Sequence, residues 1–572
     1  MHYFIFALIL INKNNKSEVN ILRYIGPFFR MNSLSQKDIS GQLFHLSKEA
    51  IKTIVLDSKC GILSSFRSSK KSSTHDISIL KDFYPLLCIY KKASPVFIHS
   101  KSSRSFDESS FKKEINPGTN ALMTLCVLEL SNYYSNYKNC NKNIKSLEKS
   151  YEILAKEQLT FYYENLRNSE GVFVDKKNIS DGNSKGYNLI EKDKKFDFSD
   201  QAFMMNAYYL FSLYYPNDEI SEEFKSFSLQ ILDMFFEFKE ALYNLSFDEG
   251  CEILLAFNVF YSYSEEERCK DLIIDLSDFL INKFDEKDYF INSLDSCCIF
   301  ALDLNDAFKH TNILSFKEKR NEILEKLNSL YDEDKGIIVK LTEKKEYKYS
   351  SLELCLYLLS ILMDTDENES PSTRKSMISN VYRKYFINSG IVSSWPEAPT
   401  LDEVERYRGL SLHSDDMLDE TFFRMPSVQS PQGCGVAPIF CKNVTYSRKK
   451  DSFSTPKNSF DSRKNMFIFF NFIYYLKDEI IDTMNFKSDI NLVPKESKSN
   501  ETLNNIETNE INNLDDNKLS IEETSKSKEI TNIDTKNDII TTNTDNTLNM
   551  DTRIDSNDNK NKHLCEKENK KS

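Results

Sequence analysis

Acidic side chains recur at the starts of predicted helices, where carboxyl groups could act as general acid and general base. Four of these acids lie three residues after a Ser, Asp or Asn, and a fifth follows the single Trp of the chain. The candidate catalytic residues are Asp200, Glu249, Asp295, Glu353 and Glu397. The first four also fit a capping box, in which the acid satisfies backbone N–H groups and suits the helix dipole. We favour capping over catalysis for these four positions.

A second acidic motif reads D-D-x-x-D and comprises Asp415, Asp416 and Asp419. Acids at positions i, i+1 and i+4 of a helix share one edge, and hard carboxylates suit magnesium bound to diphosphate. The motif is similar to the magnesium-binding motif of prenyl synthases and class I terpene synthases, which implies a metal site at these three positions. Those families carry a second acidic motif on a facing helix, and this chain has none. A solvated loop or a helix start is therefore the favoured interpretation.

A long segment, residues 386–460, is rich in Pro and Gly and interrupts the helical pattern. Loops of this length inside a compact domain are often functional. Its candidate binding residues are Trp395, Tyr407, Arg408, His413 and Arg424. Aromatic side chains there could stack on sugar rings, or Trp, Tyr and Arg could form a surface that docks a protein partner. The favoured alternative is a lid that covers the helices and buries its own aromatic residues.

The elements that must position these residues are predicted to be helices in pairs, because apolar residues recur at helical spacing. Leu272, Ile273, Leu276, Phe279 and Leu280 form one such stripe. The predicted first helices are 119–136, 199–214, 248–262, 294–309 and 351–363, and the second helices are 144–166, 220–242, 265–283, 316–330 and 372–386. Further helices are expected at 37–56, 76–91 and 464–483.

A glycine followed by an apolar run recurs after several of these helices. The instances are Gly61, Gly171, Gly336 and Gly390, and residues 288–291 look like the same element without its glycine. A glycine just past a helix can adopt the left-handed conformation that ends it. The apolar residues after it are expected to dock on the neighbouring repeat. The glycines are separated by near-multiples of about 55 residues, which indicates stacked repeats.

Repeated helix hairpins, each closed by a short glycine-apolar return, resemble the α/α toroid over residues 36–486. Six-hairpin glycosidases, some polysaccharide lyases, lanthionine cyclases and terpenoid cyclases share that architecture. In toroid glycosidases the ends of the inner helices line the cleft, so the resemblance implies that carboxylates there act as acid and base. The Cys and Cys-His zinc motifs of lanthionine cyclases are absent. We expect an all-α fold, as an α/α toroid or as an open, curved array of hairpins.

Composition and motif content indicate which classes of binding partner and which cellular compartment to expect. A net charge of −13, with Lys and Arg mixed among the acids, argues against nucleic acid. No CxxC pair, no His pair at ligand spacing, no phosphate loop and no nucleophile elbow is present, so we expect no cofactor. Twelve scattered cysteines are typical of reduced thiols in a cytoplasmic protein. The apolar residues 2–11 lack a basic start and are too short to span a membrane.

The chain divides into three predicted parts. Residues 1–35 form an N-terminal extension outside the fold, 36–486 form the helical-hairpin domain, and 487–572 form a disordered tail that contains no aromatic residue. No motif decides whether the domain is an enzyme. The preferred hypothesis is a binding or scaffold protein whose partner is a protein or a carbohydrate. The alternatives are a six-hairpin carbohydrate-active enzyme and, more distantly, an enzyme that processes prenyl diphosphates.

Overall fold

The computed structural model describes residues 35–64, 80, 82–91, 99–100, 103–104, 111–136, 142–180, 187–192, 195–342, 344–364, 371–396, 438–454, 456 and 460–490. These residues belong to one compact unit, which is predominantly helical, so the predicted all-α class is confirmed. The extension at 1–35 and the tail at 487–572 lie almost wholly outside the described residues.

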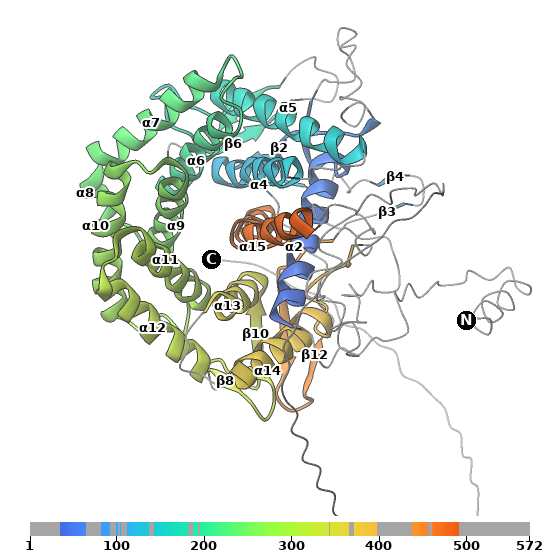
Figure 1. The fold of residues 1–572 in the computed structure, drawn as a ribbon, viewed down its shortest axis with the longest axis vertical. Coiled ribbons are helices and arrows are strands. Elements are labelled where there is room, and N and C mark those ends of the chain that lie inside the picture. The colour runs from blue at the N-terminus through green and yellow to red at the C-terminus, as the bar shows by residue number, and fades with distance from the viewer. Residues whose placement is uncertain are drawn as a thin grey trace, which may run out of the picture. The chain divides into compact units, whose positions relative to one another are not determined.

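Helices alternate between an inner and an outer layer along the chain (Figure 1). The inner helices are α4 (Pro117–Ser135), α6 (Phe198–Tyr214), α9 (Phe247–Ser264), α11 (Leu294–Thr311), α13 (Ser351–Met363) and α15 (Ser462–Ile490). The outer helices are α5 (Lys142–Asn165), α7 (Ser221–Glu237), α10 (Glu267–Asp285), α12 (Leu314–Ser329) and α14 (Pro371–Val381). Each of these outer helices packs against the inner helix that precedes it. The short helix α8 (Lys239–Leu242) follows α7.

Each inner helix contacts the next one in the order α4, α6, α9, α11 and α13, and α15 contacts both α13 and α4. Helix α2 (Gln36–Lys52), which a π-helical turn (Thr53–Asp57) extends, packs against α15 and so takes the place of its outer helix. The first and last helices of the described region therefore form a hairpin-like pair although they lie more than 400 residues apart.

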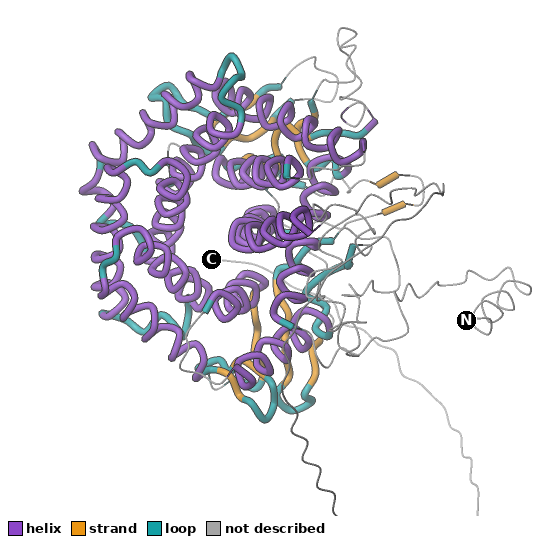
Figure 2. The backbone as a smooth tube through the Cα atoms, in the orientation of Figure 1, coloured by secondary structure: helices purple, strands orange, loops and turns teal. Residues whose placement is uncertain are grey.

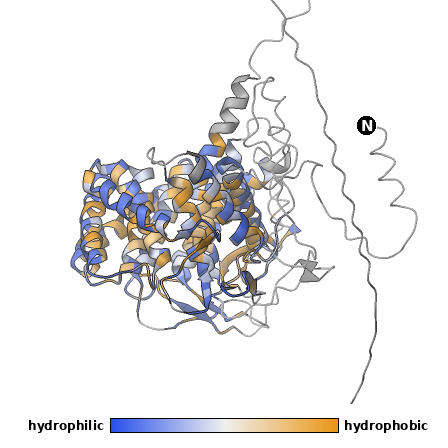
Figure 3. Cartoon of the chain, turned by 90° about the horizontal axis from the view of Figure 1, so that it is seen from below, coloured by the Kyte–Doolittle hydropathy of each residue, from blue (hydrophilic) through white to orange (hydrophobic). Residues whose placement is uncertain are grey.

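The composition of each layer matches its position. Inner helices are apolar on most of their circumference, and α9 buries eleven of its residues, from Phe247 to Phe260. In α10 the buried residues Leu272, Ile273, Leu276 and Leu280 follow the predicted stripe, which leaves the opposite face to solvent. Hydrophobic and hydrophilic stretches consequently alternate along the helices (Figure 3).

Short antiparallel strands connect the helices (Figure 2). Two three-stranded sheets comprise β5 (Glu114–Ile115), β6 (Lys176–Asn178) and β7 (Leu189–Glu191), and β10 (Glu346–Ser350), β11 (Asn443–Ser447) and β12 (Ser452–Ser454). Three pairs comprise β1 (Gly61–Leu63) with β2 (Leu86–Ile89), β3 (His99–Ser100) with β4 (Ser103–Arg104), and β8 (Tyr331–Asp332) with β9 (Ile337–Ile338). The predicted helix at 76–91 is wrong over 86–89, because these four buried residues pair with β1.

Three of the four glycines have the predicted positive φ, but none of them is the residue that ends a helix, because α5 ends at Asn165, Gly336 lies between β8 and β9, and Asn388 caps the helical turn before Gly390. Gly171, Gly336 and Gly390 have φ values of 89°, 61° and 75°, which is the region that disfavours side chains. Beyond Gly171, the backbone of Phe173 exchanges two hydrogen bonds with the side chain of Gln201 on α6, so this run docks on the next hairpin. Gly61 differs, because it lies within β1, where a Cβ atom would collide with the carbonyl oxygen of Cys88.

Candidate functional site

Four of the five predicted catalytic acids, Asp200, Glu249, Asp295 and Glu353, lie at the N-terminal ends of neighbouring inner helices. We call this group the N-terminal cluster; it comprises Asn116, Asp200, Asp248, Glu249, Glu252, Asp295, Glu353, Arg463 and Lys464. Hydrogen bonds and charge interactions connect its members across α4, α6, α9, α11, α13 and α15. Sequence reasoning did not single out Arg463, whose interaction with Asp200 spans 263 positions and leaves no local signal.

Asp200 is the most buried of the four predicted catalytic acids that the structure describes, with 3% of its surface exposed. Its Oδ2 accepts a hydrogen bond of 2.7 Å from Asn116 Nδ2, and its Oδ1 lies 3.3 Å from Arg463 Nη1. A Cβ atom on Gly118 would lie only 2.0 Å from Oδ1, so glycine at the start of α4 lets the carboxylate approach. Burial raises the pKa of Asp200 to about 7, although the positive charge of Arg463 opposes the increase.

Arg463 and Glu249 connect further hairpins to this group. Arg463 Nη2 donates to Glu252 Oε2 at 2.5 Å, so one guanidinium links the acids of α6 and α9. Glu249 Oε1 accepts a hydrogen bond of 3.1 Å from the backbone N–H of Phe198, at the start of the neighbouring α6. Burial and the nearby Asp197 raise the pKa of Glu249. Glu249 therefore binds the preceding hairpin instead of closing a capping box on its own helix.

Asp295 and Glu353 occupy the next two inner helices. Burial and the charge of Glu353 raise the pKa of Asp295 to about 6, whereas Lys464 lowers it. Glu353 closes a capping box with Ser350, and its Oε1 also lies 2.6 Å from Lys340 Nζ. The capping-box prediction is thus correct for Glu353. It is wrong for Asp200 and Asp295, since neither helix has a side-chain cap. It is half right for Glu249, because the Ser246 hydroxyl accepts a hydrogen bond from the Glu249 N–H but the carboxylate bonds to Phe198.

Chemically, the N-terminal cluster holds two carboxyl groups whose pKa values lie near neutrality, and such groups can donate protons. Each acid of the N-terminal cluster other than Asp295 accepts a hydrogen bond from another segment of the fold, and the donor to Asp248 is Ser296 of α11, at 2.6 Å. These contacts hold the hairpins in register. They also limit the oxygens that remain open to a substrate.

Of the candidate residues predicted in segment 386–460, the structure describes Trp395. Trp395 is 5% exposed and packs edge-on against Tyr382, with ring centroids 6.3 Å apart, as a lid that buries its aromatic residues would. The other loop candidates lie outside the described residues: Glu397, Tyr407, Arg408, His413, Asp415, Asp416, Asp419 and Arg424.

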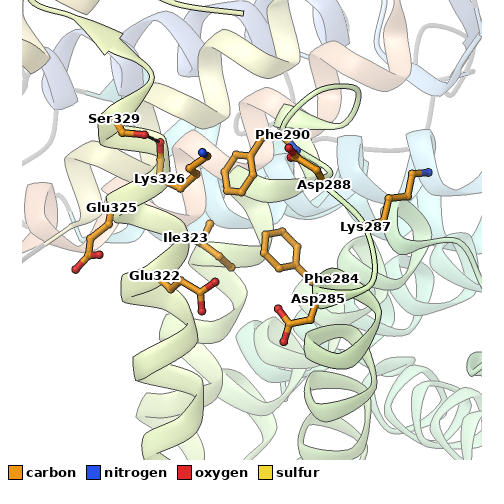
Figure 4. Close-up of a pocket in the computed structure, with 10 residues that line it drawn as sticks. All are labelled: Phe284, Asp285, Lys287, Asp288, Phe290, Glu322, Ile323, Glu325, Lys326 and Ser329. Atoms are coloured by element: carbon orange, nitrogen blue, oxygen red, sulfur yellow. Dashed lines mark hydrogen bonds between the residues drawn. The ribbon is translucent and has the colours of Figure 1, made fainter. Parts of the chain in front are cut away.

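A pocket that the sequence did not predict lies on the outer layer, between α10 and α12. It has a volume of about 530 Å³, within the usual range for ligand pockets. We call it the α10–α12 groove; its lining residues are Phe284, Asp285, Lys287, Asp288, Phe290, Glu322, Ile323, Glu325, Lys326 and Ser329. Figure 4 shows the two phenylalanine rings and Ile323 in the middle, with charged side chains around them.

The groove results from how the two hairpins pack. Helices α10 and α12 both pack against α11, which leaves a depression between the outer helices. The lining residues of α12 follow helical spacing and so share one face, while Phe290 comes from the turn after α10. Lys319 Nζ lies 2.8 Å from Asp285 Oδ1 and 2.6 Å from Glu322 Oε2, and so joins the two helices at one end.

No known protein family matches the chain, and a search of curated proteins finds no relative. Among the described residues, no three His, Cys, Asp or Glu side chains are grouped to hold a metal ion. No helix within the described ranges is both long enough and apolar enough to cross a membrane. The N-terminal cluster and the α10–α12 groove are therefore the two features of the molecule that bear on its function.

Proposed function

We propose that this protein is a binding scaffold without catalytic activity, built as an α/α toroid of six helix hairpins. The toroid is supported by the contacts of α15, which pairs with α13 on one side and with α4 on the other. It is also supported by α2, which supplies the sixth outer helix. Such an array offers a large rigid surface of helices and grooves to a partner.

One observation carries the proposal: the carboxylates at the N-terminal ends of the inner helices are used to connect hairpins. Asp200, Glu249 and Glu252 all bond to a neighbouring hairpin. A general acid or nucleophile must present its oxygen to a substrate in open space. Acids that hold the fold together are expected to affect stability when they are changed, and not to affect any reaction.

The test compares stability and turnover for the full chain and two variants, Asp200→Asn and Glu249→Gln. Thermal shifts are measured with oligosaccharides, divalent cations and prenyl diphosphates, and oligosaccharide cleavage is followed through new reducing ends. We expect both variants to lower the melting temperature, and we expect no cleavage by any form of the protein. Cleavage that is lost in Asp200→Asn would overturn the scaffold proposal.

A carbohydrate-active enzyme of the six-hairpin type is the second candidate. It is favoured by the pKa values of Asp200 and Asp295, which burial raises to about 7 and about 6. A carboxyl group that stays protonated near neutral pH is what a general acid requires. The cleavage assay above distinguishes the two candidates, because only this one predicts turnover.

The cysteines support a reducing location, and we propose the cytoplasm. All cysteines in the described part are buried and none forms a disulfide. Burial raises the pKa values of Cys126, Cys298 and Cys355 well above their ordinary value, so these thiols are inert and serve to pack the core.

A further inference from the structure

We propose that the α10–α12 groove binds a short segment of a partner protein in which one apolar side chain is flanked by Arg or Lys. The inference rests on the proposed binding function and names its site and partner. The apolar side chain would contact the floor of the groove, and the basic side chains would pair with its rim.

The apolar residues at the floor of the α10–α12 groove are the reason to expect an apolar side chain in the partner segment. Phe290 is partly exposed at the turn that closes the groove and Phe284 is 8% exposed, so these two rings supply its accessible apolar surface, and Ile323 beside them is fully buried. The rings of Phe284 and Phe290 meet edge to face, with centroids 5.7 Å apart. An apolar side chain inserted beside these two rings would be desolvated, and a few desolvated residues of this kind supply most of the binding energy of an interface.

The charged residues at the rim of the groove are the reason to expect Arg or Lys on both sides of that apolar side chain. Four carboxylates line the groove, on Asp285, Asp288, Glu322 and Glu325, against the ammonium groups of Lys287 and Lys326. Lys319 already pairs with Asp285 and Glu322. Asp288 and Glu325 are exposed and have no ion-pair partner among the described residues. They lie on opposite sides of the apolar floor, so they can pair with basic residues on both sides of an anchor (Figure 4).

The charge pattern favours a peptide over the other ligand classes that the sequence raised. A net negative lining repels diphosphates and other anions. A sugar would need hydrogen-bond donors and acceptors beside a flat aromatic face, whereas the two phenylalanine rings in the middle of this groove meet edge to face. Arg is favoured over Lys as the flanking residue, because its guanidinium can also stack on the face of the partly exposed Phe290 ring.

Fluorescence anisotropy with the full chain tests the inference. The probe is a fluorescein-labelled peptide with one Leu between two Arg on each side, and its companions carry Glu in place of Arg or Ser in place of Leu. We expect both companions to bind at least about tenfold more weakly than the probe, which corresponds to 1.4 kcal/mol. Binding of the Glu peptide as tightly as the Arg peptide would overturn the inference.

Two variants with matched controls locate the site. Glu325→Lys and Phe290→Ala should each weaken the probe at least about tenfold. Glu318→Lys, on an exposed position of α12 outside the groove, and Phe238→Ala, on an aromatic residue that is 49% exposed elsewhere, should leave binding unchanged. Melting temperatures verify folding, and Glu325→Lys, which alters an exposed side chain, keeps the test decisive if Phe290→Ala unfolds.

The outcomes separate this inference from the proposed function. Equal weakening by Glu318→Lys would mean that the basic peptide senses only the net charge of −13, and the groove assignment would fail. Absence of probe binding would overturn the groove assignment as well. Neither result touches the scaffold proposal, which the cleavage assay decides.

Discussion

The guanidinium of Arg463 lies 3.3 Å from the carboxylate of Asp200, and this contact joins the start of α15 to the start of α6. The same guanidinium also binds Glu252 of α9. Both side chains of the first pair are largely buried, with 21% and 5% exposure. Removal of the cation would leave the Asp200 carboxylate without its charged partner in a low-dielectric site.

We therefore predict that at pH 8, above the pKa of Asp200, Arg463→Met lowers the free energy of unfolding by about 3 kcal/mol, the usual cost of breaking a buried ion pair. Arg463→Lys should recover only part of the loss, since a single ammonium group cannot bind two carboxylates as a planar fork does. Denaturant unfolding measures both variants. A loss of less than about 0.5 kcal/mol for Arg463→Met, as at an exposed pair, would contradict the role assigned to this contact.

A substitution at Gly118 tests the same contact between Asp200 and Arg463, because this glycine lies against both side chains. A Cβ atom there would lie 2.0 Å from Asp200 Oδ1 and 2.2 Å from Arg463 Nη1. We expect Gly118→Ala to cost about 1–3 kcal/mol through overpacking. The matched control is Gly250→Ala on α9, where the new atom would meet the flexible end of Leu280 at 2.6 Å. If the two variants unfold at the same denaturant concentration, the close approach at Gly118 has no special importance.

A buried ion pair near the C-terminal end of α4 provides a third prediction. Glu129 is fully buried and accepts hydrogen bonds from Lys477 of α15 and from Tyr214 and Tyr263 of α6 and α9. Lys477→Met should destabilise the protein by about 3–5 kcal/mol, because it leaves a buried carboxylate uncompensated. The double change of Glu129→Gln with Lys477→Met should recover part of that loss.

The control for that pair is Lys335→Met, which breaks an exposed ion pair with Asp332. Surface pairs of this kind contribute about 0–1 kcal/mol. Comparable losses for Lys477→Met and Lys335→Met would show that burial does not set the strength of the contact between Glu129 and Lys477.

Local sequence signals predicted the elements better than the site. Helical spacing predicted α9, α10 and α13 within a few residues of their bounds, because the apolar stripe of a helix repeats every three or four residues within one short stretch of sequence. The same reasoning placed a helix over β2, since a run such as Leu86–Ile89 is apolar throughout and carries no period. A buried strand and a buried helix segment look alike at that length.

The site depended on relationships that no local pattern contains. Capping boxes were predicted at four helix starts, but three of the acids do not close one, because Asp200 and Glu249 bind the adjacent hairpin and the helix of Asp295 has no side-chain cap. The α10–α12 groove was missed because Phe284 and Phe290 resemble ordinary core residues in sequence. The depression beside them arises because α10 and α12 both pack against α11, which is a relationship between distant segments.

Truncation tests the predicted end of the folded region. Helix α15 reaches Ile490, four residues beyond the predicted boundary, and Ile480 within it is fully buried. We expect a chain that ends after residue 490 to melt at the temperature of the full chain, because residues 491–572 contain no aromatic side chain to add to a core. A clear decrease in the melting temperature would show that the omitted residues contribute contacts.

Asp303 leads to a prediction about pH. This residue of α11 is fully buried, and no hydrogen-bond donor in the described part of the chain reaches either carboxyl oxygen. Burial, together with the nearby Asp306, raises the pKa of Asp303 well above its ordinary value of 3.8. In the folded protein the carboxyl group is therefore protonated at a pH at which the unfolded chain has already ionised.

The folded state then binds one proton more than the unfolded state, so stability decreases as the pH rises above about 4 and continues to do so up to the folded-state pKa. Asp303→Leu removes this dependence. We expect the free energy of unfolding of the variant to increase, relative to that of the natural chain, by up to about 1.4 kcal/mol for each pH unit. Denaturant unfolding of both proteins at pH 5, 6, 7 and 8 measures the difference. A constant difference across that range would mean that Asp303 is ionised in the folded protein and has a partner that compensates its charge.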